Sequence, residues 1–169
     1  SSPARRFRYA AGCRSSSKVE LVILIGLQAS GKSTFARRHL AETHEYVSKD
    51  ELRRNRSRAR RQVQLIEAAL QVGRSVVVDN TNPTVEERAA LLHQGRAYGA
   101  RLVGYFFDAT VQDCLARNRL RTGRSRVPDV AIYATAKKLA RPSYAEGFDS
   151  LFSVHMLAGE FEVSAWERE

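Results

Sequence analysis

The strongest constraint on this chain is a complete match to the pattern GxxxxGK[ST], which reads GLQASGKS between Gly26 and Ser33. The match follows the apolar run 19–25 and precedes the amphipathic stretch 32–43, so we expect a strand before the loop and a helix after it. In that context backbone N–H groups converge on phosphate oxygens, and the helix N-terminus adds a partial positive charge. The pattern therefore predicts a loop that binds a nucleoside triphosphate.

The residue types in this loop indicate individual roles. Lys32 is expected to reach the β and γ phosphates, and the Ser33 hydroxyl to ligate Mg²⁺. The predicted nucleotide contacts from the loop are Gly26, Leu27, Gln28, Ala29, Ser30, Gly31, Lys32, Ser33 and Thr34. A chance glycine-rich turn is the alternative explanation, and the motif leaves open whether the acceptor is water, a small molecule or a polymer.

Short apolar runs alternate with longer amphipathic stretches along the rest of the chain. Strands are expected at 19–25, 46–48, 76–79, 102–107 and 151–154, and helices at 32–43, 50–72, 84–97, 111–121 and 128–140. This alternation is typical of βαβ units, so residues 19–169 are predicted to form one α/β domain with a mostly parallel sheet covered on both faces. Ligands of such sheets bind at the carboxyl ends of the strands.

Two acidic residues follow predicted strands and are candidates for the chemistry. Asp79 ends a run of three valines beside the predicted P-loop, where a carboxylate is expected to act on Mg²⁺, usually through water. Its alternative role is a cap on the following turn. Asp50 can accept the proton of an incoming hydroxyl, or it can cap the predicted helix. Arg53 shares a helical face with Asp50 and can hold a phosphate of the acceptor.

Arginines form two dense clusters, with six between positions 53 and 61 and five between 117 and 126. Arg117 and Arg121 are spaced i, i+4 before a glycine-bearing loop, which predicts a lid that closes over the triphosphate. A lid arginine can neutralise charge on the transferred group. A solvated surface is the alternative for both clusters. Arginine supplies 23 of the 28 basic residues and the net charge is +10, which favours an anionic partner such as nucleic acid.

Other features bound the class of protein. Residues 1–18 contain five basic residues and no acid, so a basic, flexible extension is expected, with a transit peptide as the alternative. The longest apolar run, 21–27, is far shorter than the roughly 20 residues of a membrane span. Cys13 and Cys114 are not arranged as a CxxC pair, so neither a disulfide framework nor a zinc site is expected, and a cytoplasmic location fits best.

Several short elements, taken in chain order, resemble the kinase module of the 5′-polynucleotide kinases of phage and animals. They are the loop 26–34, SKDELR at 48–53, DNTNP at 79–83, RNRLR at 117–121, VP at 127–128 and the stretch 142–148. The D-x-T-N and R-N-x-x-R elements are more specific than the P-loop, and the resemblance covers roughly residues 19–154. We find no DxDxT phosphatase signature in the sequence.

The resemblance implies a P-loop kinase fold with an arginine-bearing lid, three layers and ATP and Mg²⁺ as cofactors. It implies transfer of the γ-phosphate to the 5′-hydroxyl end of RNA or DNA, with no obligatory protein partner. Lys32, Asp50 and Arg121 would then be catalytic, with Asp50 as general base. The remaining implied roles are ATP binding for Arg117 and Arg121, acceptor binding for Arg53, Thr81 and Asn82, and metal binding for Ser33 and Asp79.

Two other functions stay open at this stage. The chain also resembles compact bacterial P-loop kinases, so the acceptor can instead be the hydroxyl of a nucleoside, sugar or antibiotic. Such a kinase would show weak salt dependence, because few backbone phosphates are neutralised. The other alternative is a nucleotide-binding regulatory module that does not transfer phosphate.

Overall fold

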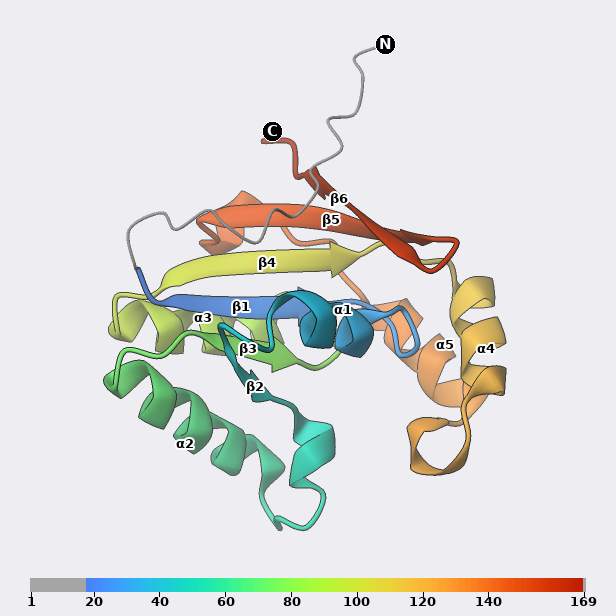
Figure 1. Ribbon diagram of the computed structural model, residues 1–169, viewed down its shortest axis with the longest axis horizontal. Helices are drawn as coiled ribbons and strands as arrows, with labels where there is room; N and C mark the ends of the chain where they lie inside the picture. The colour runs from blue at the N-terminus through green and yellow to red at the C-terminus, as the bar shows by residue number, and fades with distance from the viewer. Residues whose placement is uncertain (1–17, 169) are drawn as a thin grey trace.

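A computed structural model describes residues 18–168, which form a six-stranded sheet in the order β2-β3-β1-β4-β5-β6 (Figure 1). The strands are β1 (Glu20–Ile25), β2 (Glu45–Val47), β3 (Val76–Asp79), β4 (Arg101–Phe107), β5 (Ser150–Leu157) and β6 (Glu160–Ala165). The first five strands run parallel, and β6 is antiparallel to β5. The predicted mostly parallel sheet is therefore confirmed. The expected extension at 1–18 lies, except for Lys18, outside the described residues.

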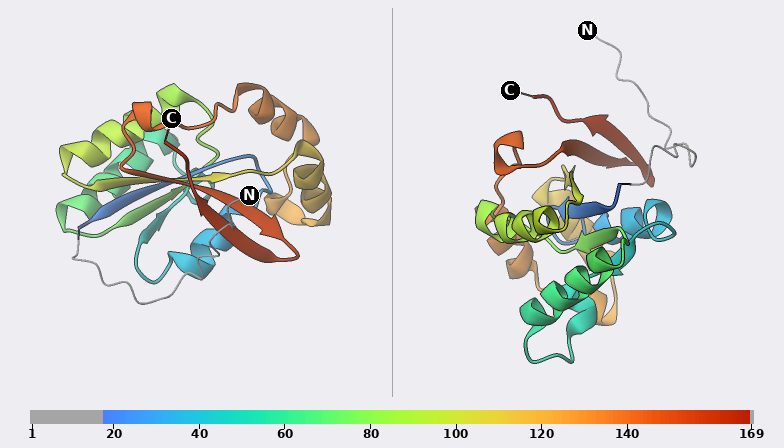
Figure 2. Two further views of the ribbon diagram at one scale, coloured as in Figure 1. Left: turned by 90° about the horizontal axis from the view of Figure 1, so that it is seen from above. Right: turned by 90° about the vertical axis from the view of Figure 1, so that its left-hand side faces the viewer.

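Helices cover both faces of this sheet and make the fold three-layered (Figure 2). They are α1 (Lys32–His39), α2 (Arg58–Gln71), α3 (Val85–Ala97), α4 (Val111–Leu120) and α5 (Asp129–Lys138), with short 3₁₀ helices η1 (Lys49–Leu52), η2 (Gly123–Ser125) and η3 (Tyr144–Glu146). Among residues 18–168, no helix has both the length and the apolar character needed to cross a membrane.

The central strand β1 supplies both halves of the hydrophobic core, because successive residues of a strand point to opposite faces. On one face Ile23 packs in a cluster with Ile66 of α2 and Leu91 of α3. On the other face Leu24 belongs to a cluster that includes Phe35 of α1. Burial on both faces explains why β1 is an unbroken apolar run. The packed strand holds the loop that follows it at the carboxyl edge of the sheet.

The predicted helix 50–72 is wrong in its first third. Residues 49–52 form the 3₁₀ helix η1, which Ser48 caps by accepting a hydrogen bond from the backbone N–H of Asp50 at 3.3 Å. The α-helix begins only at Arg58. This start leaves Arg53, Arg54 and Arg56 outside α2, so fewer like charges lie three and four positions apart at the positive end of the helix dipole. The predicted helix 32–43 likewise ends earlier, at His39.

Strand β6 was not predicted from the sequence. It pairs with β5 through the turn Ala158–Gly159, and the hairpin leans over α1, where the ring of Phe161 lies 5.4 Å from that of Phe35. A side chain at Gly31, whose φ is 99°, would collide with Met156 of the hairpin. The positive φ is the main requirement for glycine at position 31, because the Met156 atom in question is the terminal methyl of a flexible side chain.

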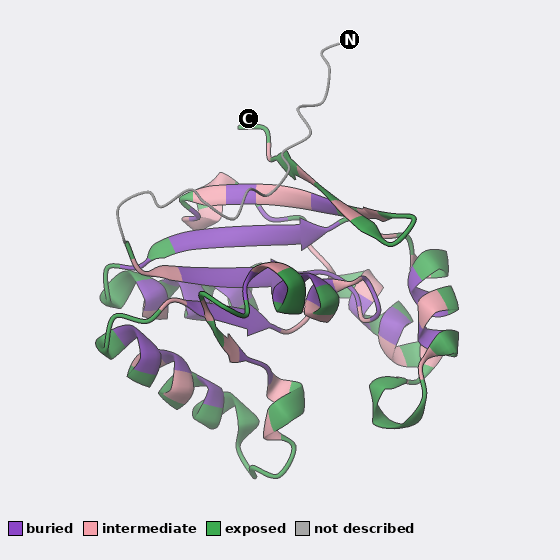
Figure 3. Ribbon diagram, viewed as in Figure 1, coloured by how far each residue is buried: buried purple, intermediate pink, exposed green. Residues whose placement is uncertain are grey.

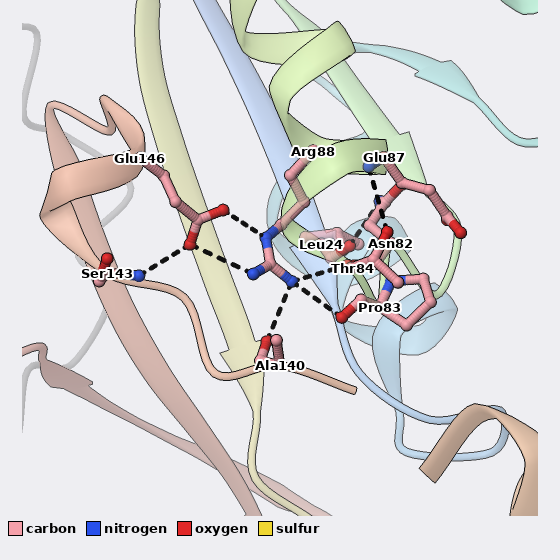
Figure 4. Close-up of polar contacts among 9 residues, drawn as sticks. All are labelled: Leu24, Asn82, Pro83, Thr84, Glu87, Arg88, Ala140, Ser143 and Glu146. Carbon is pink, nitrogen blue, oxygen red and sulfur yellow. Dashed lines mark hydrogen bonds and ion pairs between the residues drawn. The ribbon is translucent and has the colours of Figure 1, made fainter. Parts of the chain in front are cut away.

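A buried ion pair fastens the segment after β3 to the segment after α5 (Figure 4). The Arg88 guanidinium, fully buried on α3, donates to both carboxylate oxygens of Glu146 at 2.8 and 3.2 Å. It also donates to the backbone carbonyls of Asn82, Pro83 and Ala140 at 3.0, 3.2 and 3.0 Å. Because the buried charge is paired and hydrogen-bonded on every side, it holds the DNTNP turn in place.

Candidate active site

One open cleft of about 590 Å³ lies at the carboxyl edge of the sheet. Its walls come from the P-loop and the start of α1, from η1, from the end of β3, and from the segment 121–127 between α4 and α5. The lining residues are Gln28, Ala29, Gly31, Lys32, Ser33, Thr34, Arg37, Tyr46, Ser48, Asp50, Glu51, Arg53, Asp79, Asn80, Thr81, Arg121, Arg124, Ser125 and Val127. The topology therefore brings most of the predicted site residues into a single cavity.

Lys32 lies at the base of this cleft and is held by the P-loop itself. Its ammonium donates to the carbonyls of Gly26 and Leu27 at 3.0 and 2.5 Å, and to the Ser30 hydroxyl at 3.4 Å. Burial lowers the pKa of Lys32 to about 8, against an opposing effect of the Asp79 carboxylate. A triphosphate that enters the loop has to replace these carbonyls as the partner of the charge.

The Asp79 carboxylate is fixed by two hydroxyl groups. Ser33 Oγ donates to Asp79 Oδ2 at 2.6 Å, and Tyr46 on β2 donates to the same oxygen. Burial and, next, the hydrogen bond to Asp79 raise the pKa of the Tyr46 hydroxyl, which therefore stays a donor at neutral pH. Asp79 is 5% exposed, so its position is set by the protein before any ligand binds.

The pair Ser33 and Asp79 fits the requirements of Mg²⁺. A hydroxyl and a carboxylate oxygen lie side by side at the phosphate-binding loop, and Mg²⁺ takes oxygen ligands from one or two protein groups together with phosphates and water. No group of three or more His, Cys, Asp or Glu side chains in residues 18–168 is placed to hold a metal by itself.

Asp50 in η1 and Arg53 at its C-terminal end also line the cleft, and both side chains are more exposed than Asp79. The Asp50 side chain is 82% exposed and forms an ion pair with Arg53 at 4.0 Å. Arg53 also donates to the backbone carbonyl of Arg124 at 3.3 Å. It thereby connects the end of η1 to residues 121–127, which we call the lid segment. Ser48, and not Asp50, is the N-cap of η1, so the alternative prediction that Asp50 caps a helix is wrong.

The lid segment is shaped by one residue that the sequence analysis did not single out. Asn118 on α4 is buried, and its amide both donates to the Val127 carbonyl at 2.7 Å and accepts from the Val127 N–H at 3.0 Å. These two hydrogen bonds hold the end of the loop between α4 and α5 against α4. Arg121 and Arg124 of that loop line the cleft. Arg117 instead donates to the Ala29 carbonyl at 3.4 Å, behind the P-loop.

Some predicted contacts lie away from the open cavity. Leu27 packs with Cys114 in a small apolar cluster, and the backbone N–H of Gly26 is used by the Thr81 carbonyl at 3.0 Å. Asn82 is buried, and its amide donates to the Leu24 carbonyl at 2.7 Å. Thr81 lines the cleft as expected, whereas the side chain of Asn82 is committed to the turn.

Further residues in the cleft or hydrogen-bonded to its lining were not singled out by the sequence analysis. Tyr46 sits on the shortest strand, and no motif marks it. Gln62 of α2 accepts a hydrogen bond at 2.7 Å from Asn80, which in turn accepts one from the Lys49 N–H at 2.9 Å. Arg124 belongs to the predicted lid cluster, but nothing in its spacing separates it from its neighbours.

Comparison with known proteins finds two relatives with related names. A bifunctional polynucleotide phosphatase/kinase of Schizosaccharomyces pombe is 26% identical over 141 residues, which are 80% of this chain and 33% of the relative. A putative bifunctional polynucleotide phosphatase/kinase of Acanthamoeba polyphaga mimivirus is 30% identical over 145 residues, 81% of this chain and 33% of the relative. The chain spans about a third of the length of these relatives. The expected resemblance to polynucleotide kinases is confirmed.

Solved structures share the fold at low identity. Chaetomium thermophilum Kti12 in complex with ADP-AlF3 matches with a TM-score of 0.66 at 17% identity, over 80% of this chain and 89% of Kti12. A gluconokinase from Sinorhizobium meliloti matches at 0.58 and 19%, over 80% and 82% of the two chains. A fungal RNA kinase matches at 0.58 and 16%, over 80% and 38%. The fold is therefore that of P-loop kinases, and it does not select an acceptor.

A family model matches residues 21–142 and so includes every residue that lines the cleft. The model is described as an AAA domain, and it covers the P-loop, the DNTNP turn and the lid segment. These are the parts that the sequence analysis assigned to nucleotide, metal and acceptor binding. The chain therefore belongs to the AAA domain family.

Proposed function

We propose that the protein transfers the γ-phosphate of ATP to the 5′-hydroxyl end of RNA or DNA, with Mg²⁺ as cofactor. The observation that carries this proposal is the shared cleft, which Asp50 and Arg53 line together with Lys32 and Arg121. A carboxylate and a phosphate-binding cation on one wall suit an alcohol next to a phosphate, which is the chemistry of a polynucleotide 5′ end. The names of the two curated relatives support the same acceptor.

In this proposal the nucleotide half of the cleft works mainly by positioning. The P-loop amides and Lys32 hold the β and γ phosphates, after the ammonium leaves the carbonyls of Gly26 and Leu27. Ser33 and Asp79 would hold Mg²⁺, which when bound neutralises charge on the phosphates. Arg121 stabilises the charge that spreads over the transferred group.

The acceptor half supplies the proton transfer. Asp50 accepts the proton of the 5′-hydroxyl while that oxygen forms its bond to the γ-phosphorus and the bond to the ADP oxygen breaks. Arg53 binds the phosphate that follows the terminal nucleoside, which directs the hydroxyl toward Asp50. Because Arg53 contacts Arg124 across the cleft mouth, the incoming phosphate competes with the lid carbonyl for this guanidinium.

Incubation with labelled ATP, Mg²⁺ and 5′-hydroxyl oligonucleotides of RNA and DNA tests the proposal directly. We expect label at the 5′ end, and none on oligonucleotides that already carry a 5′-phosphate. A folded protein that binds ATP but labels no oligonucleotide would refute it. Transfer to nucleosides, sugars or antibiotics instead would establish the small-molecule alternative, and slow hydrolysis without any acceptor would favour a regulatory module.

A further inference from the structure

Beside the cleft, between η1 and the second turn of α2, lies a surface that the proposed chemistry does not use. It carries the arginine patch, which we define as Arg54, Arg56, Arg58, Arg60 and Arg61. All five residues are exposed, and Figure 3 shows the loop before α2 and the start of that helix as a continuous exposed stretch. The patch begins one residue after Arg53, which lines the cleft.

The charges of the patch are not balanced by neighbouring acids. No Asp or Glu occurs between Glu51 and Glu67, and in residues 18–168 none of the five patch arginines forms an ion pair. Arg61 donates to Gln64 at 3.4 Å, which leaves its charge uncompensated. The first turn of α2 contains no acidic residue, so the positive end of the helix dipole adds to the same potential. A surface of one sign attracts an extended anion.

We propose that the arginine patch binds the internucleotide phosphates of a single-stranded polynucleotide whose 5′ end occupies the cleft. This proposal rests on the proposed function. The chain offers the patch in continuity with Arg53, so phosphates beyond the first pass from the cleft mouth onto Arg54 and then toward the start of α2. Arginine forks match phosphate oxygens in geometry, and an exposed, uncompensated run of them suits a flexible strand of regularly spaced charges. The patch makes the enzyme sensitive to acceptor length.

The test uses two triple variants that remove equal charge. The patch variant is Arg54→Gln/Arg56→Gln/Arg58→Gln. The control variant is Arg74→Gln/Arg96→Gln/Arg101→Gln, which changes exposed arginines near the amino ends of β3 and β4, at the edge of the sheet opposite the cleft. Both are compared with the unchanged protein on a 5′-hydroxyl dinucleotide and on a 5′-hydroxyl oligonucleotide of about 12 nucleotides, within the usual range of single-strand site sizes.

We expect the patch variant to raise KM for the longer acceptor by about tenfold, as the sum of three exposed charge contacts, and to leave kcat/KM for the dinucleotide unchanged. Fluorescence anisotropy of the longer strand without ATP should show a salt slope smaller by about two, at about 0.7 for each phosphate that the variant no longer neutralises. The control variant should behave as the unchanged protein in both measurements.

Three results would overturn the proposal. These are equal strand binding and equal salt slope for the patch variant and the unchanged protein, an equal loss in the control variant, and an equal loss on the dinucleotide, which would indicate a disturbed η1. If no protein transfers phosphate but the patch variant alone loses strand binding, the patch is supported and the proposed kinase activity is the part that fails.

Discussion

The two carboxylates of the cleft are held in opposite ways. Asp79 is 5% exposed and accepts hydrogen bonds from Ser33 and Tyr46, whereas the Asp50 side chain is 82% exposed and pairs with Arg53 at 4.0 Å. A buried carboxylate with two donors keeps its position without a ligand, but an exposed one is ordered by what binds beside it. Under the proposed function, the nucleotide half of the cleft is therefore preorganised, and the acceptor half is completed by the acceptor.

Arg121 lines the cleft and is proposed to act on the transferred group itself, so its removal should have the largest effect. We expect Arg121→Ala to lower kcat by about 10³-fold, since a lid arginine stabilises charge that develops only during transfer. Single-turnover kinetics at saturating ATP measures this loss. Arg119→Ala removes a nearby exposed arginine of α4 that does not line the cleft. Equal losses in both variants would mean that general positive charge, and not the position of Arg121, supports the reaction.

Asp50→Asn tests whether the exposed carboxylate takes the proton. We expect kcat to fall by about 10²–10⁴-fold, the range of general-base effects, while the Kd for ATP and the melting temperature stay unchanged. Glu51→Gln removes the same charge from the same turn and should cost far less. If Asp50→Asn weakens ATP binding as strongly as it lowers kcat, then Asp50 belongs to the preorganised half and the contrast between the two carboxylates is wrong.

The same contrast separates what the sequence could predict from what it could not. The nucleotide half rests on local signals, because an apolar strand, a glycine-rich loop and a helix follow one another in the chain. Asp79 could be placed since it ends a run of three buried valines. Tyr46 could not, because its partner is 33 positions away and only the pairing of β2 with β3 brings them together.

Long-range pairing also explains the other omissions. Arg88 and Glu146 are 58 positions apart, and no local pattern marks these two charged residues as fully or almost fully buried. The helix start at Arg58 was missed for a different reason, because apolar periodicity predicts a helix and says nothing of repulsion among arginines. Local patterns therefore predicted most residues that line the cleft, whereas tertiary contacts decided which side chains hold them in place.

Lys32 gives a test of the preorganised half by pH. Burial lowers the pKa of Lys32 to about 8 in the free protein, whereas bound phosphates favour the charged form. Above pH 8 binding of ATP must therefore take up a proton, and affinity should fall by up to about tenfold per pH unit. By the same linkage the folded state gains stability between about pH 8 and the ordinary lysine value of 10.5, because the unfolded chain binds more protons there.

Calorimetry in buffers with different ionisation enthalpies measures this proton uptake. Lys32→Arg is the matched variant, since its guanidinium stays charged throughout the range. It should bind ATP with no change of affinity across pH 8. The prediction is wrong if the protein without a substitution binds ATP with the same Kd below and above pH 8. Lys32 would then already be charged before the nucleotide binds.

Of these substitutions, Tyr46→Phe should have the smallest effect on activity. It tests the contrast between Asp79 and Asp50 most directly, because the Tyr46 hydroxyl donates to Asp79. The variant removes one of two donors to Asp79 and leaves the ring in place, so we expect a loss of about 1 kcal/mol in the free energy of unfolding. Because Tyr46 orients a carboxylate that would act on Mg²⁺, the Mg²⁺ concentration for half-maximal activity should rise by about tenfold. Denaturant titration and a Mg²⁺ titration at saturating ATP measure the two effects.

Tyr98→Phe is the control for this variant, because the Tyr98 hydroxyl donates to Glu67 at 2.5 Å between α2 and α3, outside the cleft. It should leave the Mg²⁺ requirement unchanged. If Tyr46→Phe lowers kcat at saturating Mg²⁺ as far as Asp50→Asn does, then its hydroxyl contacts the acceptor. In that case the two halves of the cleft share a residue, and the preorganised half extends to the alcohol itself.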